Sequence, residues 1–189
     1  MLSTIKAFVR TLTVVSIVGM TLGANQKETA APTISAKALQ EVVAPGETFE
    51  VEIAVENVSD LAVVQFKMVT DGGQSGAMTI EDIVIDDRHP NFAFRTAQIL
   101  AVVDHALERA GVIQMTGGQD IAESAYLATV TVRASKDAAG VFRVNLDEGG
   151  ETFLRDSHAV PIDVAVRNAS TVRVADIAQP TEANRKTRR

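Results

Sequence analysis

The sequence predicts an all-β fold, namely a nine-stranded antiparallel β-sandwich with jelly-roll-like topology. Segments in which apolar and polar residues alternate follow one another at close intervals from Thr33 onward, which is typical of all-β domains. The chain is 46% hydrophobic and rich in Val and Ala, and β-branched residues favour strands. Strands with one apolar face bury that face when two sheets pack together, so the pattern favours a sandwich.

Two neighbouring segments carry the clearest strand pattern. In residues 48–56, apolar residues alternate with acidic or small ones, which predicts one buried face and one wetted face. The apolar residues are Phe49, Val51, Ile53 and Val55. Residues 61–69 alternate in the same way, with Ala62, Val64, Phe66 and Met68 on one face and Val63, Gln65, Lys67 and Val69 on the other.

The remaining elements rest on shorter patterns. Residues 71–76 contain three glycines and are a predicted loop, because glycine adopts the positive φ angles that turns require. Residues 96–109 fit either a short helix, through the spacing of Ile99, Leu100, Val103 and Leu107, or a strand at 98–103. The other predicted strands are 78–85, 112–116, 125–134, 141–147 and 170–175, with turns at 138–140 and 148–150.

The first 24 residues have the order of regions found in a secretory signal peptide. Lys6 and Arg10 precede an apolar run over 12–22, and a small residue, Ala24, stands at the expected cut. The mature chain is then expected to start near Asn25, and an uncleaved N-terminal anchor is the alternative. The predicted organisation is a signal peptide at 1–24, a spacer at 25–32, a domain at 33–175 and a flexible basic tail at 176–189.

Charge and cysteine content exclude several classes of function. The formal net charge is −6, and it becomes −8 without residues 1–24, because these hold two of the 18 cationic residues and none of the 24 acidic ones. An acidic chain repels phosphate backbones, which disfavours nucleic-acid binding. The chain has no cysteine, so disulfides, a thiolate nucleophile and cysteine-based zinc sites are excluded.

No residue pattern indicates catalysis or a cofactor site. The histidines are widely spaced and stand in polar surroundings, at His89, His105 and His158. Some acidic residues are of the type that binds calcium, but they lack the spacing of a calcium-binding loop. These candidates are Asp86, Asp87, Asp147, Glu148 and Asp156. We therefore expect no enzyme, no bound metal and no cofactor, and a hydrolase is the least favoured alternative.

Four segments follow one another along the chain with a recognisable pattern, namely residues 45–66, 126–134, 141–146 and 156–174. In this order they resemble the cohesin domain family, whose β-sandwich modules grip a partner protein and are related to carbohydrate-binding modules. Residues 45–66 combine a Pro-Gly turn, an alternating strand, an Asn-Val-Ser-Asp turn and a second strand, as at the opening of a cohesin. Residues 126–134 resemble its seventh strand. Residues 141–146 and 156–174 resemble its eighth strand, its long polar loop and its final strand.

The resemblance spans about residues 33–175 and has two gaps. Cohesins commonly continue the third strand into an aromatic-Asp-Pro step, whereas here the stretch is Val-Thr-Asp-Gly-Gly at 69–73 and retains only Asp71. Residues 90–110 have no clear counterpart, which leaves the position of the fifth strand open.

The resemblance implies a secreted, periplasmic or envelope-associated binding module that docks a dockerin-like protein or a polysaccharide. No nucleic-acid partner and no membrane span after signal cleavage are expected. A carbohydrate-binding module and a structural accessory domain of an envelope complex are the alternatives. Carbohydrate-binding modules usually display Trp or Tyr, whereas this chain has no Trp and a single Tyr, Tyr126, which is expected to be buried at a strand start.

The resemblance also implies a binding face. In cohesins this face belongs to the sheet that contains strands three, five, six and eight. Matching those strands directs five polar residues outward, namely Gln65, Lys67, Gln114, Arg143 and Asn145. It directs four apolar residues inward, namely Phe66, Ile113, Phe142 and Val144.

Overall fold

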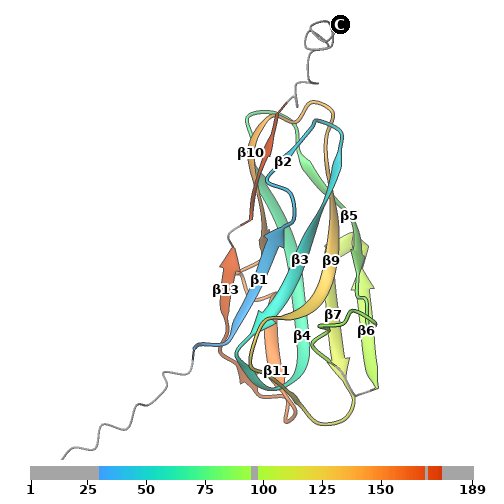
Figure 1. Cartoon of the computed structure of the whole chain (residues 1–189), viewed down its shortest axis with the longest axis vertical. Helices are drawn as coiled ribbons and strands as arrows, with labels where there is room; N and C mark the ends of the chain where they lie inside the picture. Colours follow the sequence, from blue (N-terminus) through green and yellow to red (C-terminus); the bar gives the residue numbers. More distant parts are fainter. Residues whose placement is uncertain (1–29, 95–97, 169, 176–189) are drawn as a thin grey trace, which may run out of the picture.

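The computed structural model describes residues 30–94, 98–168 and 170–175, which form a β-sandwich (Figure 1). The predicted all-β sandwich is therefore confirmed. The described residues form fourteen strands and one 3-10 turn, η1 (His105–Leu107). The strands are β1 (Thr33–Ala38), β2 (Val42–Val43), β3 (Thr48–Glu56), β4 (Val58–Gly72), β5 (Met78–Val84), β6 (Ile99–Asp104), β7 (Arg109–Gln114), β8 (Gln119–Ile121), β9 (Ala125–Ala134), β10 (Gly140–Leu146), β11 (Phe153–Asp156), β12 (Pro161–Ile162), β13 (Ala165–Asn168) and β14 (Thr171–Val174).

The strands are arranged in two sheets that lie face to face. The first sheet has the order β13-β1-β3-β9-β5 and lies in front in Figure 1. The second sheet is built around β4, which pairs with β10 and β11 along one edge and with β7 and β8 along the other. β6 lies beyond β7, while β14 and β2 continue from β10, and β12 continues from β11. We call this second layer the β4 sheet.

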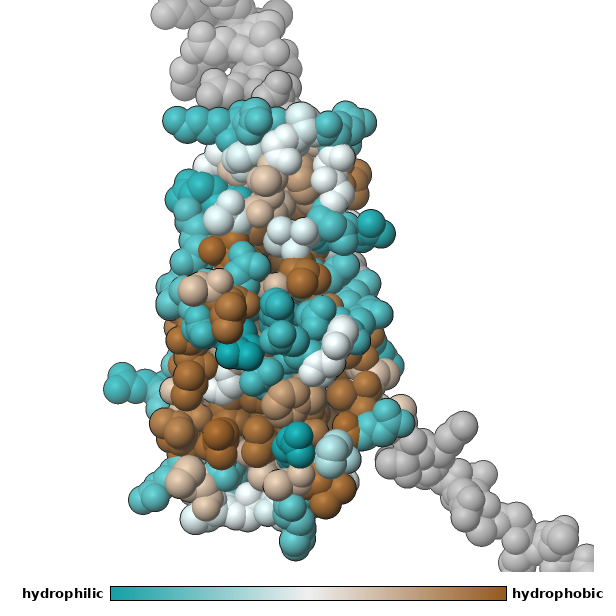
Figure 2. Space-filling model, turned by 180° about the vertical axis from the view of Figure 1, so that it is seen from behind, coloured by the Kyte–Doolittle hydropathy of each residue, from teal (hydrophilic) through white to brown (hydrophobic). Residues whose placement is uncertain are grey.

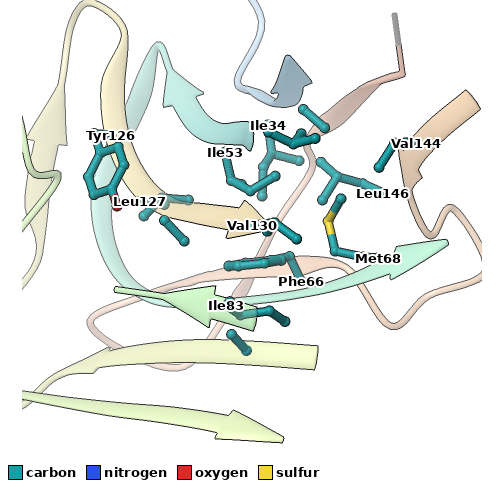
Figure 3. Close-up of a cluster of buried hydrophobic side chains, with 14 of the residues drawn as sticks. Ile34, Ile53, Phe66, Met68, Ile83, Tyr126, Leu127, Val130, Val144 and Leu146 are labelled. Carbon is teal, nitrogen blue, oxygen red and sulfur yellow. The ribbon is translucent and has the colours of Figure 1, made fainter. Parts of the chain in front are cut away.

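The core lies between the two sheets and follows the alternation of the sequence. Val51, Ile53 and Val55 of β3 are fully buried, as the pattern predicts. Ala54 belongs to the opposite face of the same strand, yet it is also buried, because the pairing of β3 with β9 shifts by one residue between Ile53 and Ala54. Figure 3 shows Phe66 of β4 and Val130 of β9 among the side chains that fill the space between the sheets.

Two strand pairs differ from the purely antiparallel arrangement that the sequence predicts. β1 pairs with β13 in parallel, and β14 pairs with β2 in parallel. Asn168, the last residue of β13, connects the two layers, because its Oδ1 accepts from the Leu146 amide at 2.7 Å and its Nδ2 donates to the Leu146 carbonyl at 2.8 Å. These extra pairs and several short strands raise the number above the predicted nine, while the sandwich itself is unchanged.

The segment 96–109, for which a helix and a strand were both possible, contains a strand followed by a sharp reversal. Residues 95–97 lie outside the described part of the chain, and β6 begins at Ile99. The Asp104 carboxylate accepts hydrogen bonds from the amides of Ala106 and Leu107, which starts η1. Glu108 adopts a left-handed φ of 53°, which ends η1 and directs β7 back along β6.

The predicted signal peptide at 1–24, most of the spacer at 25–32 and the basic tail at 176–189 lie outside the described residues. Within the described ranges, no helix is long and apolar enough to cross a membrane.

Candidate functional site: the exposed face of the β4 sheet

The β4 sheet turns one side toward the core and one side outward, and the outward side is the face that the sequence analysis predicts for docking. In β4, Val64, Phe66 and Met68 are buried, whereas Gln65 and Lys67 are partly exposed, as the two-residue period requires. The outward side chains of β6, β7, β4, β11 and β10 together form what we call the β4 face.

Strand register places the outward residues of the β4 face in rows that cross the sheet. Gln65 is opposite Gly111 of β7 on one side and Phe153 of β11 on the other, and Gly111 is opposite Val102 of β6. The next row joins Leu100, Ile113, Val63 and Arg155 through the same pairings. Side chains directly opposite one another in antiparallel strands lie about 5 Å apart, so each row is a continuous strip of contacts.

The apolar part of the β4 face surrounds a shallow depression of about 300 Å³. Gly111 forms its floor because it carries no side chain, and a Cβ atom there would lie 3.1 Å from the Val64 carbonyl oxygen. The apolar side chains around it are Val63, Val102, Ile113 and Phe153. The Arg155 guanidinium lies 5.3 Å from the centre of the Phe153 ring.

Much of this apolar surface is open to solvent. Val102 is 55% exposed, Leu100 52% and Ile113 39%. Figure 2 shows the molecule from this side, with hydrophobic surface gathered in the lower half of the view and along its left margin. Contiguous apolar surface rimmed by polar groups is typical of a protein-interaction site.

A row of charged side chains borders the apolar patch. Lys67 Nζ lies 3.7 Å from the Glu151 carboxylate, and the Arg109 guanidinium lies 3.5 Å from the same carboxylate. Arg109 also lies 3.9 Å from the carboxylate of Asp104, so the charges run from β6 across β7 and β4 to the segment before β11. Exposed pairs of this kind contribute little to folding, but a fixed charge pattern selects the partner that binds beside it.

Four of the five predicted site residues have the predicted orientation. Gln65 and Lys67 point outward from β4, and Arg143 and Asn145 point outward from β10, whereas Phe66, Phe142 and Val144 point into the core. Arg143 is paired at 2.6 Å with the carboxylate of Asp71, the residue directly opposite it on β4. Asn145 is opposite Val69 on the same side of the sheet, but its Oδ1 is buried and has no hydrogen-bond partner among the described residues.

The prediction for β7 was wrong by one residue. Gln114 is only 8% exposed and lies on the inner side, while Ile113 faces outward. Val112 and Ile113 are both apolar, so alternation alone does not decide which of them is buried; pairing of Ile113 with the outward Val63 decides it. The buried Gln114 amide donates from Nε2 to the Thr116 carbonyl at 3.0 Å, and its Oε1 has no hydrogen-bond partner among the described residues.

Sequence reasoning missed the residues that contribute most to the apolar patch and the charged row. Leu100 and Val102 lie in the segment left open between helix and strand, and Glu151 follows a predicted turn. Had 98–103 been assigned as a strand, its period of two would have placed Leu100 and Val102 on one face together. Glu151 carried no such signal, because its contact with Lys67 joins positions 84 residues apart in the sequence.

The histidines and carboxylates considered for catalysis or metal binding occupy separate places. The His89 ring stacks on Tyr126 at 4.0 Å, and His105 lies 3.9 Å from Asp82. Tyr126 is 4% exposed, so the prediction of a buried tyrosine is confirmed. Among the described residues, one group could offer three ligand atoms within 4.8 Å of one another, formed by Asp60, Asp156 and His158.

Hydrogen bonding accounts for the Asp60, Asp156 and His158 group without a metal. Asp60 Oδ2 accepts from the Ser157 hydroxyl at 2.7 Å, and Asp156 Oδ1 accepts from the amides of His158 and Val160. These bonds fix the loop that follows β11. Of the calcium candidates named from the sequence, this group includes Asp156 alone.

Comparison with known proteins gives a clear result for structure alone. Neither a protein-family model nor a curated protein sequence matches the chain. Among solved structures, the third ScaB cohesin of R. flavefaciens, in complex with a group 1 dockerin, is similar with a TM-score of 0.59 at 15% identity, over 78% of this chain and 98% of that one.

Two further cohesins show the same likeness. The sixth cohesin of scaffoldin B from Acetivibrio cellulolyticus, in complex with a Cel5 dockerin mutant, has a TM-score of 0.54 at 14% identity, over 77% of this chain and all of that one. A non-cellulosomal cohesin from the archaeon Archaeoglobus fulgidus has a TM-score of 0.52 at 16% identity, over 85% of this chain and all of that one. The described part of this chain therefore has the cohesin fold.

Proposed function

We propose that this chain is a non-catalytic docking module that binds a protein partner of the dockerin type through the β4 face. The observation that carries the proposal is the exposed apolar patch around Gly111, bordered by the row of charges from Asp104 to Glu151. A helical partner can place one apolar side chain into the depression and set its charged groups along the row. The solved cohesins in complex with dockerins support this proposal.

The β4 face offers little to a polysaccharide. Sugar-binding surfaces usually rely on exposed Trp or Tyr side chains, and this chain has no Trp and a single, buried Tyr126. Phe153 is the one aromatic residue that lines the depression, and Arg155 lies over its ring. We therefore favour a protein partner over a carbohydrate.

Docking is tested by changing the β4 face without touching the core. A partner isolated by pull-down from the secreted fraction is titrated by calorimetry against wild type and Ile113→Glu. Because a carboxylate would have to be desolvated at the centre of the apolar patch, affinity should fall about 10- to 100-fold, or about 1.4–3 kcal/mol. Reversing Lys67 and Arg143 together to Glu should also weaken binding, by about tenfold or more.

The matched control is Val84→Glu, which changes a similarly exposed apolar residue on β5 of the other sheet. This variant should bind like wild type, and all variants should unfold at nearly the same temperature. Equal affinity of Ile113→Glu and wild type, with an intact fold, would move the site off the β4 face. A chain with no saturable partner would indicate a structural accessory role instead.

We further propose that the chain acts outside the cytoplasm, as a secreted or envelope-associated protein. The basic, apolar and small-residue regions of residues 1–24 support export. N-terminal sequencing of mature material is expected to begin near Asn25. Mature protein that still begins at Met1 would show that the segment is retained as an anchor.

A further inference from the structure

β6 is an open edge of the β4 sheet. Among the described residues it pairs only with β7, and Figure 1 shows it at the right-hand margin of the sandwich. Its first five residues, 99–103, are Ile-Leu-Ala-Val-Val and carry no charge. Its pairing with β7 is continuous from Ile99 to Asp104, without a bulge. An edge of this kind is a template for another strand.

The other edge strands are protected against such pairing. β2 and β12 have two residues each and β8 has three, and β12 begins with Pro161, which has no amide hydrogen to donate. β5 carries Glu81 and Asp82 at a shift in its pairing with β9, and the four-residue β13 carries Arg167. Short length, proline, bulges and charge are the usual devices that block edge pairing, and residues 99–103 of β6 have none of them; the charged residue of the strand is Asp104, at its end.

The free hydrogen-bonding groups of β6 can be assigned. The Met115 amide donates to the Gln98 carbonyl at 2.9 Å, which makes residues 98 and 115 a hydrogen-bonded pair. In an antiparallel ladder such pairs alternate, so residues 98, 100, 102 and 104 bond to β7. The amide and carbonyl groups of Ile99, Ala101 and Val103 therefore point away from the sheet, and Ala101 itself is exposed.

We propose that β6 pairs with β6 of a second copy of this chain, antiparallel and across a two-fold axis at Ala101. In this register Ala101 meets Ala101, and Ile99 meets Val103, so that all the free groups of both strands form hydrogen bonds. Leu100 then lies opposite Val102 on the outer side. The backbone groups and side chains of β6 are thus complementary to those of β6 in a second copy. A two-fold interface requires such a self-complementary surface.

Charge does not oppose this pairing at the contact itself. Two chains of net charge −6 repel one another over most of their surface, but residues 99–103 bring no charge to the contact. Asp104, at the end of the strand, already has Arg109 at 3.9 Å. The paired strands would join two β4 sheets into one, with the two β4 faces side by side, so that the dimer offers two docking faces to a partner that carries two motifs.

A single cysteine tests this pairing, because the natural chain has none. In a hydrogen-bonded antiparallel pair the Cα atoms lie about 5.5 Å apart, which suits a disulfide. The full chain carrying Ala101→Cys should form a covalent dimer readily under mild oxidation. Val84→Cys, an exposed position on the edge strand of the other sheet, is the control and should stay largely monomeric. Equal or faster cross-linking through position 84 would overturn the proposal.

The mass of the full chain in solution provides an independent readout. Wild type should approach twice its 20.1 kDa across a concentration series in light scattering. Ala101→Pro removes an amide that points to the free edge and leaves the β7 bonds intact, so it should be monomeric with a similar melting temperature. Ala101→Ser keeps the amide and should remain dimeric. A wild-type chain that stays monomeric throughout excludes the dimer, whereas affinity at the β4 face is measured separately and would be unaffected.

Discussion

Val51→Asp is expected to unfold the domain. Val51 is fully buried in β3, between Ala38 of β1 and Val130 of β9, and no cationic residue is buried beside it in the described core. An unpaired carboxylate in such a place costs several kcal/mol, against a total stability of about 5–15 kcal/mol for a domain. Thermal unfolding followed by circular dichroism should show loss of the cooperative transition, or a melting temperature lowered by well over 10 °C.

The control for Val51→Asp lies one residue away. Glu52 is on the outer face of β3, opposite Lys37 of β1 and Thr129 of β9. Glu52→Lys places two like charges opposite each other, so it should cost at most about 1 kcal/mol and leave the fold intact. A disruptive Glu52→Lys together with a harmless Val51→Asp would mean that β3 is turned the other way.

Gly76→Ala should have the second-largest effect on stability. Gly76 has a φ of +73°, and a Cβ atom there would lie 2.5 Å from the Ala138 Cα atom and 2.6 Å from the Ala138 amide nitrogen. These contacts are with backbone, so the loop before β5 and the turn before β10 would both have to move. Left-handed backbone costs alanine about 1 kcal/mol and the clash about 1–3 kcal/mol more, so the free energy of unfolding should fall by about 2–4 kcal/mol.

Gly117→Ala separates these two contributions. Gly117 has a similar φ of +67°, but an added Cβ atom would have no neighbour within 4 Å. Only the backbone cost remains, so this variant should lose about 1 kcal/mol in urea unfolding. If both alanine variants lost the same stability, the contact between Gly76 and Ala138 would contribute nothing.

The sequence determined the parts of this protein that depend on local pattern. Alternation in 48–56 and 61–69 identified the apolar face of β3 and β4 that packs into the core, because a half-buried strand must repeat every two residues; Ala54 and Leu61 are buried as well, outside this pattern. The same reasoning oriented Phe142, Arg143 and Val144 correctly. Of the five polar residues predicted to point outward, four lie on the outer side of the β4 sheet, because the patterns of β4 and β10 are clear. That this side binds a partner stays a prediction.

Tertiary structure decided the features that depend on pairing between distant segments. Val112 and Ile113 are both apolar, so only the register of β7 against β4 turns Ile113 outward and buries Gln114. Residues 99–104 have no preference between strand and helix until β7 supplies a hydrogen-bonding partner. The charged row needs Lys67 and Glu151 to meet across 84 positions, and no local pattern encodes such a contact. Propensity and period act within a few residues, whereas register and long-range contacts are set by which strands the whole fold brings together.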